Sequence, residues 1–344
     1  MRHMILFLLA VLTFSSNAIA QTDSEVKTPK NFIYFGLERA GIKEPKFLES
    51  NSVVGAQLKY TWKELEPERD LYELQPVLDD LAYLESHGKK LFIQIQEVSF
   101  DESIVNVPQY LREDPEFGGG VAHKLEFDDD DESNPKSDGW VARRWDPDVQ
   151  DRFIKLLNAM GKVLDGRIEG INLPETSIGF GNSGKYHPPG YTFESYREGV
   201  KAIMTGARKA FPESTVIQYA NFMPGEWLPW TDKGYLKSVY EHAEEIGLGV
   251  GGPDVLPHRR GQRNHSLPLI RDREASISAG LAVQSGNLSQ KNPSTGERVT
   301  VPELYSFSAD SLKLDYIFWG IQEPYYTGEI LPFLNGLKKK GMNQ

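Results

Sequence analysis

Residues 74–96 read LQPVLDDLAYLESHGKKLFIQIQ and contain two segments with different hydrophobic patterns. Apolar residues recur every three or four positions from Leu74 onward, which is the spacing of an amphipathic helix. Gly88 is a typical residue to end such a helix. The apolar run that follows is typical of a strand buried on both faces of a parallel sheet. The stretch therefore predicts a helix over Leu74–His87 and a strand over Lys90–Gln96.

The same alternation of strand-like and helix-like segments recurs along the chain. Eight short apolar runs are expected to be strands: Phe32–Leu37, Val53–Leu58, Lys90–Gln96, Ile168–Leu173, Thr215–Ala220, Leu248–Gly252, Gly280–Gln284 and Asp315–Trp319. Further helical patterns cover Asp148–Leu164, Phe193–Phe211 and Leu236–Ile246. Eight such units predict an α/β protein with a (β/α)8 TIM barrel. A doubly wound sheet is the alternative, but the glycine-rich phosphate loop expected after its first strand is missing at residues 35–39.

Unequal loops indicate which end of the barrel holds a site. Segments after the predicted strands are long, whereas segments leading into strands are short, and barrels place their active sites on the post-strand face. The largest segment is a loop insertion after strand 3, residues 100–146, with an acidic run at residues 128–132. Calcium binding by this run is conceivable, but its spacing is not that of an EF-hand, so a solvated loop is expected.

Composition excludes several classes of protein. The chain has 344 residues and no cysteine, which rules out disulfides, thiolate metal sites and a cysteine nucleophile. Its net charge of −11 argues against binding to nucleic acid. No H-E-x-x-H or G-x-S-x-G motif occurs, which argues against a metalloprotease or an esterase of these families. We expect neither a metal nor a cofactor.

The first twenty residues have the pattern of an export signal. Arg2 precedes an apolar run over Met4–Phe14, and Ala18-Ile19-Ala20 forms a cleavage signal. An N-terminal membrane anchor is the alternative, but the apolar run is too short to span a bilayer. The prediction is a signal peptide at residues 1–20 and one catalytic domain at residues 21–344, secreted or periplasmic in a bacterium and free of the membrane after cleavage.

Carboxylates and aromatic residues gather at the predicted strand ends. All six tryptophans lie in or just after these ends, where aromatic faces can stack on sugar rings, although some of them are expected to be ordinary core residues. The strand-end carboxylates are Glu38, Glu64, Glu66, Glu97, Glu175, Asp254 and Glu323. Glu175 is the strongest candidate for an acid, because an asparagine, a proline and two hydroxyl residues flank it in INLPETS, residues 171–177. The alternative is a glutamate that only fixes its loop.

Three segments carry a resemblance to a known family. GAQLKYTWKELEP (residues 55–67), LY (71–72) and GKKLFIQIQ (88–96) resemble the second and third units of the retaining (β/α)8 glycoside hydrolases, the superfamily of β-galactosidases and cellulases. The segment from Asn172 to Glu175 is similar to that family's acid/base motif, and IFWG at residues 317–320 is similar to its eighth-strand tryptophan segment. The resemblance implies a glycosidase with Glu175 as acid/base and Trp319 under the sugar.

The chain departs from the family where the nucleophile is expected. The family has a glutamate at the end of strand seven, whereas this sequence has Gln284, which cannot form a glycosyl ester. Glu323 can replace it from across the barrel, in an inverting arrangement, whereas Asp254 and Glu97, both nearer to Glu175, can serve as the base or accept hydrogen bonds from the substrate. A third alternative is a barrel that binds sugar without cleaving it.

The predicted site therefore combines carboxylates, amides and aromatic rings. The catalytic candidates are Glu175, Glu323 and Asp254, with retention or inversion left open. The residues expected to bind substrate are Trp62, Glu97, Asn172, Asn221, Trp227, His258, Gln284 and Trp319. The expected partner is a carbohydrate. It can be anionic if the basic run at residues 259–263 grips a carboxylate or sulfate, and neutral if that run is an ordinary surface loop.

Overall fold

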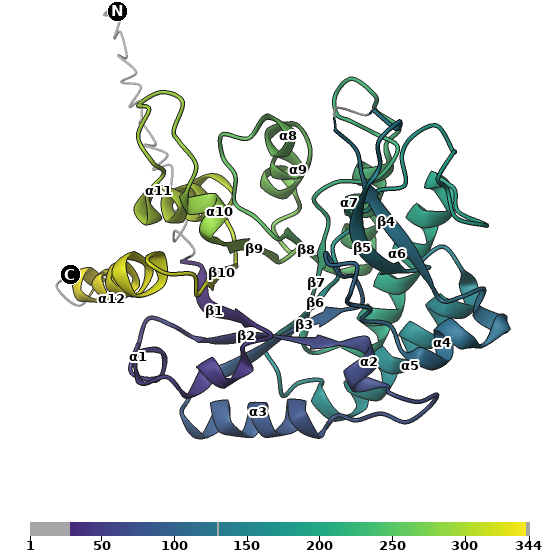
Figure 1. Cartoon of the computed structure of the whole chain (residues 1–344). Coiled ribbons are helices and arrows are strands. Elements are labelled where there is room, and N and C mark those ends of the chain that lie inside the picture. Colours follow the sequence, from purple (N-terminus) through teal and green to yellow (C-terminus); the bar gives the residue numbers. More distant parts are fainter. Residues whose placement is uncertain (1–27, 129–130, 342–344) are drawn as a thin grey trace, which may run out of the picture.

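The computed structural model of the chain describes residues 28–128 and 131–341 (Figure 1). The predicted signal peptide, residues 1–20, lies outside this part, and the boundary at residue 21 stays a prediction. Within the described ranges, no helix is both long enough and apolar enough to cross a membrane.

Eight parallel strands close into a barrel in the order β1-β10-β9-β8-β7-β6-β3-β2. They are β1 (Lys30–Gly36), β2 (Gly55–Thr61), β3 (Lys90–Gln96), β6 (Gly170–Leu173), β7 (Thr215–Tyr219), β8 (Gly249–Gly252), β9 (Ala279–Val283) and β10 (Tyr316–Gly320). Each of the eight predicted runs overlaps one of these strands. The (β/α)8 barrel is confirmed, and the closure of the sheet excludes the doubly wound alternative.

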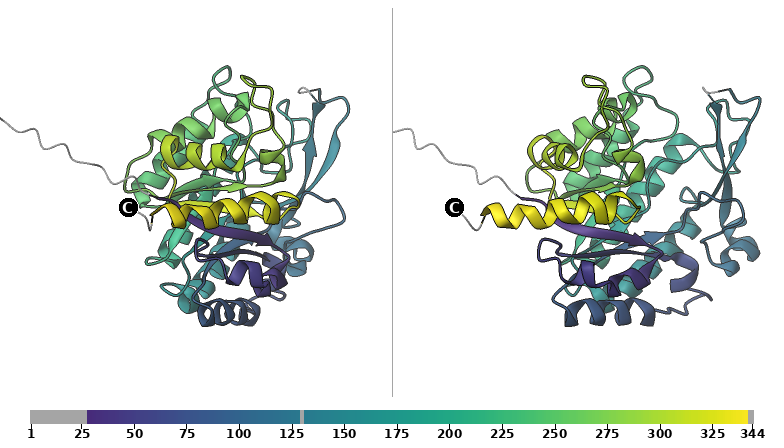
Figure 2. Two further views of the ribbon diagram at one scale, coloured as in Figure 1. Left: turned by 90° about the vertical axis from the view of Figure 1, so that its left-hand side faces the viewer. Right: turned by 60° about the vertical axis from the view of Figure 1, so that its left-hand side comes forward.

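Helices surround the barrel (Figures 1 and 2). The four predicted ones are α3 (Gln75–Ser86), α5 (Pro147–Leu164), α6 (Phe193–Ala210) and α7 (Tyr235–Ile246). Shorter helices and turns are η1 (Arg39–Lys43), α1 (Pro45–Leu48), α2 (Trp62–Leu65), α4 (Gln109–Glu113), η2 (Pro115–Phe117), α8 (Arg260–Asn264), α9 (Ser266–Asp272), α10 (Ser285–Leu288), α11 (Val301–Ser306), η4 (Phe307–Ser311), η5 (Tyr326–Ile330) and α12 (Leu331–Gly341). Helix α3 buries Val77, Leu81 and Leu84, which is the stripe that the spacing predicts.

Strand side chains alternate between the barrel interior and the helix layer, because successive residues of a strand point to opposite faces. Phe32, Phe92 and Phe318 pack together inside the barrel, with ring centroids 4.9 Å apart for Phe92 and Phe318. Their sequence neighbours, such as Ile33 and Ile93, belong to the larger core between strands and helices. The interior is thus apolar at one level, and polar residues follow toward the carboxyl ends of the strands.

The insertion after β3 is more ordered than a plain loop. It contains an antiparallel hairpin of β4 (Val121–Glu126) and β5 (Lys136–Ala142), which stands to one side of the barrel (Figure 2). Within the acidic run, Asp128 contacts Lys136 at 2.5 Å and Glu132 accepts a hydrogen bond from the backbone of Ser183. No cluster of acidic residues and histidines suited to a metal occurs in the described part of the chain.

Candidate active site

A cavity of about 300 Å³ opens at the carboxyl ends of the barrel strands. Residues from seven strands or the loops after them line it: Tyr34, Lys59, Gln94, Gln96, Phe100, Glu175, Tyr219, Pro253, Asp254 and Gln284. It therefore lies on the post-strand face, where barrel enzymes carry their active sites. Two carboxyl groups, three amides, one ammonium group and three aromatic rings make it a polar cavity with apolar faces.

Glu175 is held two residues beyond the end of β6. The Asn221 side-chain amide donates a hydrogen bond of 2.9 Å to its carboxylate. The Arg144 guanidinium binds its backbone oxygen at 2.6 Å, and the neighbouring backbone N–H of Thr176 donates to Tyr219. Burial raises the pKa of Glu175, and the charge of Asp254 raises it further, while Asn221, Lys124 and Arg144 act in the opposite direction. The environment thus favours a protonated Glu175, as a proton donor requires.

Asp254 is the second carboxylate in the cavity. It follows β8, and the side-chain amide of Asn287 donates a hydrogen bond of 3.0 Å to one of its oxygen atoms. Burial raises the pKa of Asp254, while Asn287 and the nearby charge of Arg259 oppose the shift. The structure thus brings together two of the three predicted catalytic residues.

Amide side chains complete the polar lining. The Gln284 amide donates a hydrogen bond of 3.1 Å to the backbone oxygen of Pro253, and this bond fixes the Gln284 side chain beside Asp254. The amide oxygens of Gln94 and Asn221 are buried and have no hydrogen-bond partner among the described residues. Buried acceptors of this kind call for donors, and sugar hydroxyl groups can supply them. Of the predicted binding residues, Gln284 lines the cavity, whereas Asn221 contacts it only through its hydrogen bond to Glu175.

Glu323 does not face Glu175. It lies three residues beyond β10, its side chain is 51% exposed, and it accepts hydrogen bonds from the hydroxyl group and backbone N–H of Thr327. Its nearest cation is Lys46, at 3.9 Å. The structure therefore does not place Glu323 among the residues that line the cavity with Glu175 and Asp254, and its carboxylate instead binds Thr327 in η5.

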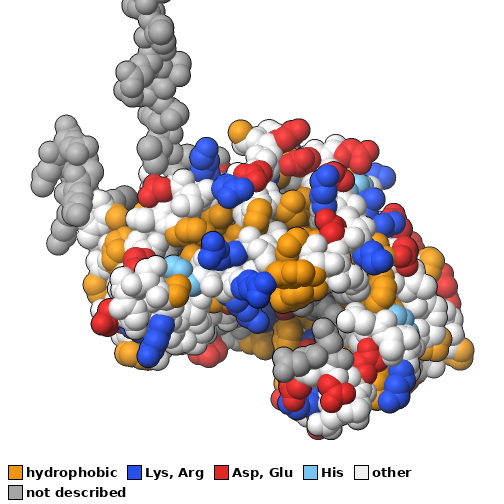
Figure 3. Space-filling model, turned by 90° about the horizontal axis from the view of Figure 1, so that it is seen from above, with side chains coloured by type: hydrophobic (Ala, Val, Ile, Leu, Met, Phe, Trp, Pro, Cys, Tyr) orange, Lys and Arg blue, Asp and Glu red, His pale blue; other side chains and the backbone are white. Residues whose placement is uncertain are grey.

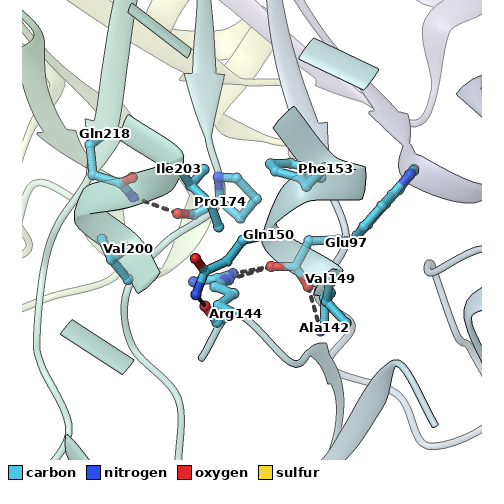
Figure 4. Close-up of a pocket in the computed structure, with 11 residues that line it drawn as sticks. Glu97, Ala142, Arg144, Val149, Gln150, Phe153, Pro174, Val200, Ile203 and Gln218 are labelled. Atoms are coloured by element: carbon cyan, nitrogen blue, oxygen red, sulfur yellow. Dashed lines mark hydrogen bonds and ion pairs between the residues drawn. The ribbon is translucent and has the colours of Figure 1, made fainter. Parts of the chain in front are cut away.

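Glu97 is a buried support for the site, and its prediction as a substrate-binding residue is wrong. Its carboxylate pairs with the Arg144 guanidinium and accepts the backbone N–H of Ala142 at 2.8 Å (Figure 4). The space beside this pair measures about 20 Å³, room for roughly one water molecule and too small for a sugar. Arg144 also binds the backbone oxygen of Glu175, so Glu97 acts on the cavity through Arg144.

The prediction that Trp62 and Trp319 bind substrate is also wrong, because neither side chain is exposed to solvent. Trp62 begins α2 and packs edge-on against Phe153 behind the strands. Trp319 points from β10 into the helix layer, where its indole N–H donates to the side-chain oxygen of Asn31 at 2.9 Å. The adjacent Phe318 faces the interior instead. Successive residues of a strand point to opposite faces, so Phe318 reaches the interior and Trp319 does not.

Three further predicted residues lie around the cavity without lining it. Asn172 is fully buried below it, where its side-chain oxygen accepts a hydrogen bond from Gln57, so direct contact with substrate is excluded. Trp227, after β7, is 49% exposed and is considered below. His258 is half-buried in the loop after β8, close enough to Glu303 to lower the pKa of that carboxyl group together with the stronger contacts from Thr300.

Sequence reasoning missed Tyr34, Lys59, Gln94 and Tyr219, which reach the cavity from inside the strands. A signal for them was present. Lys59 lies two positions after Gln57 on β2, and the same alternation relates Gln94 to Gln96 on β3. Charged and amide side chains at this spacing in otherwise apolar strands indicate the inner face.

Comparison with solved structures finds xylanases and a GH5 protein among the structures similar to this chain. The chain is similar to xylanase 10B from Thermotoga petrophila RKU-1 in complex with xylobiose, with a TM-score of 0.49 and 11% identity over 86% of this chain and 83% of that one. A GH5_18 structure from Streptomyces cattleya in complex with GlcNAc has a TM-score of 0.48 and 13% identity, over 86% of this chain and 70% of that one. A GH10 endoxylanase from a sugarcane soil metagenome has a TM-score of 0.49 and 12% identity, over 85% of each chain.

These three structures are glycoside hydrolases, the superfamily that the sequence resembles. Scores and identities this low carry no argument about function, and the strand order establishes the barrel by itself. No family model and no curated protein sequence matches the chain.

Proposed function

We propose that the protein hydrolyses O-glycosidic bonds of an oligosaccharide or polysaccharide, with Glu175 as the proton donor and Asp254 as the second carboxylate. One observation carries the proposal: two carboxyl groups whose pKa values are raised by burial face the same polar cavity at the carboxyl ends of the strands. Glycoside hydrolysis needs such a pair, one group protonated and the other charged.

The chemistry follows from the positions of these groups. Glu175 gives its proton to the glycosidic oxygen as the bond from that oxygen to the anomeric carbon breaks. In an inverting enzyme Asp254 takes a proton from the attacking water, and in a retaining enzyme it attacks the anomeric carbon itself. Gln284 lacks the carboxylate for either role, so its amide is assigned to binding a sugar hydroxyl group.

The cavity supplies the remaining contacts. Tyr34 and Phe100 offer aromatic faces for a sugar ring, and Phe100 is 59% exposed. Gln94 lines the cavity and its amide oxygen has no partner among the described residues, so a sugar hydroxyl group can donate a hydrogen bond to it. Asn221 does not line the cavity and serves instead to hold the Glu175 carboxyl group.

A carbohydrate-binding barrel without catalytic activity is the second candidate, and Gln284 at the usual nucleophile position is what favours it. The test is incubation of the purified protein with a panel of neutral and acidic polysaccharides, with release of new reducing ends measured. Glycans that bind without any release of reducing ends would establish the second candidate and refute hydrolysis. For a cleaved substrate, the anomeric configuration of the first product distinguishes inversion from retention.

Export is a separate part of the proposal. The signal pattern at residues 1–20 supports a secreted or periplasmic location. Protein recovered from the periplasm or medium of an expressing bacterium is then expected to begin at Gln21. Recovery from the cytoplasm with Met1 in place would contradict it.

A further inference from the structure

Two exposed tryptophans lie in the loop after β7, on a surface that the catalytic proposal does not use. We define the Trp–Arg surface as Phe222, Trp227, Trp230, Arg259 and Arg260, which come from the loops after β7 and β8 and the start of α8. Trp227 and Trp230 are 49% and 55% exposed, among the few large hydrophobic side chains in the described ranges that face solvent. Exposed aromatic rings next to one another mark a binding site more often than an accident of folding.

The rings of this surface are firmly supported. Phe222 and Trp227 are parallel, with centroids 5.8 Å apart, and the buried His265 ring lies 4.8 Å from each. His265 accepts the backbone N–H of Leu228 at 2.9 Å and its other ring nitrogen contacts the backbone oxygen of Gly261 at 2.8 Å. A side chain at Gly261 would come within 3.2 Å of the Trp227 ring, so glycine permits this close packing. A platform fixed in this way loses little conformational entropy when a ligand binds.

The charge of the surface is opposite to that of the whole chain. Arg259, Arg260 and Arg263 are exposed, and no carboxylate lies within ion-pair distance of them in residues 28–128 and 131–341, although the net charge is −11. The Arg260 guanidinium lies over the Trp230 ring, 4.4 Å from its centroid. Helix α8 lies near the top of Figure 1, and the face seen from above in Figure 3 carries Lys and Arg side chains among hydrophobic ones.

Two links connect the Trp–Arg surface with residues of the cavity. Asn221, which binds Glu175, directly precedes Phe222, and Arg259 is close enough to Asp254 for its charge to oppose the rise that burial causes in the pKa of Asp254. Inside the cavity the ammonium group of Lys59 likewise has no carboxylate within ion-pair distance among the described residues. Cations without a carboxylate partner therefore occur both in the cavity and on the Trp–Arg surface.

We infer that the Trp–Arg surface binds sugar units bearing an anionic group, with the tryptophan faces stacked on the rings and Arg259 and Arg260 paired with the anion. Guanidinium groups pair with planar carboxylate and with sulfate through two parallel hydrogen bonds, which suits a uronate or a sulfated sugar. The inference rests on the proposed function in that the glycan held here is the substrate whose next bond enters the cavity.

The test measures binding separately from cleavage. The full-length mature chain carrying Glu175→Gln is run in affinity gels with polygalacturonate and with its carboxyl-reduced form, and with dextran sulfate and unmodified dextran. In at least one pair, we expect the anionic polymer to retard migration of the protein. Binding to the neutral polymer of that pair should be weaker by at least about tenfold. Which pair responds identifies carboxylate or sulfate as the anion.

Variants then locate the site. Arg259→Gln with Arg260→Gln is expected to weaken anionic binding about tenfold or more, and Trp227→Ala with Trp230→Ala to weaken it similarly. Arg112→Gln with Arg167→Gln, two exposed arginines elsewhere that also lack a carboxylate partner among the described residues, removes the same charge and should leave binding unchanged.

Three results would overturn the inference: equal binding to anionic and neutral polymers, no effect of the Arg259 and Arg260 changes, or an equal effect of the control pair. Binding that follows the expected pattern while the unmodified protein releases no reducing ends would leave the inference intact and refute the proposed hydrolysis. Cleavage of neutral glycans alone, at a rate that the arginine changes do not affect, would support the proposed hydrolysis and refute the inference about the Trp–Arg surface.

Discussion

Asn221 donates a hydrogen bond of 2.9 Å to the Oε2 atom of Glu175 and thereby links the ends of β7 and β6 at the cavity. With Oε2 occupied as an acceptor, Oε1 is the atom left to carry the proton. Asn287 stands in the same relation to Asp254, at 3.0 Å. Each carboxyl group thus has one amide that fixes it and leaves its second oxygen atom for chemistry.

The pH dependence of activity should follow these two pairs. Activity is expected to fall at low pH as Asp254 is protonated and at high pH as Glu175 loses its proton. Burial raises the pKa of both groups, so both limbs should lie above the ordinary carboxyl range of about 3.9 to 4.3.

Single substitutions test which carboxyl group sets each limb of the pH profile. Asn221→Ala removes a hydrogen bond that favours charged Glu175, so the high-pH limb of kcat/KM should move upward. Asn287→Ala should move the low-pH limb upward in the same way. The reverse assignment, or limbs that neither change moves, would contradict the roles of the two carboxyl groups.

Glu175 should also reduce the stability of the fold at neutral pH. Because burial raises its folded-state pKa above the unfolded value, its unfavourable effect is absent below the unfolded pKa of about 4.3 and grows as the pH rises through the shifted range. Glu175→Gln is therefore expected to raise the Tm at pH 7, and the gain should vanish near pH 3. A gain that is the same at both pH values would show that the charge is not its cause.

The two kinds of tryptophan predict opposite behaviour. Trp319→Phe leaves the side chain of Asn31 without its indole donor inside the core, and should cost about 1 to 3 kcal/mol in the free energy of unfolding with little change in glycan affinity. Trp227→Ala should weaken glycan binding with a smaller loss of stability, because the ring is half exposed. Urea unfolding and affinity gels of both variants test this, and weaker binding in Trp319→Phe would restore it as a substrate-binding residue.

The sequence predicted the barrel well because its signal is periodic and repeated. Every run from Phe32–Leu37 to Asp315–Trp319 became part of a strand, since buried parallel strands need continuous apolar residues. Glu175 and Asp254 could be selected because they lie just past the ends of β6 and β8, on the post-strand face of the barrel.

Side-chain direction and partners could not be predicted in the same way. Trp319 and Phe318 look alike in sequence, yet one faces the helices and the other the interior. Glu97 was a reasonable candidate at a strand end until Arg144, 47 positions later, was found paired with it. Glu323 lies in a loop whose path depends on Thr327 and its neighbours. Each error comes from a contact that spacing alone does not encode.

The Glu97–Arg144 pair should be essential for the fold, since both side chains are buried. Arg144→Met leaves an unpaired carboxylate in the interior and is expected to cost about 3 to 5 kcal/mol in the free energy of unfolding. The double variant with Glu97→Gln should lose less than the sum of the single losses, as coupled partners do. Additive losses in urea unfolding would indicate that the pair contributes no interaction energy.

Joint catalysis by Glu175 and Asp254 is best tested by measuring kcat/KM for a cleaved polysaccharide in matched variants. Glu175→Gln and Asp254→Asn should each lower it by about 100-fold or more while the Tm shows a folded protein, and Glu323→Gln should leave it unchanged. Full activity in Glu175→Gln or Asp254→Asn, or a comparable loss in Glu323→Gln, would contradict the account.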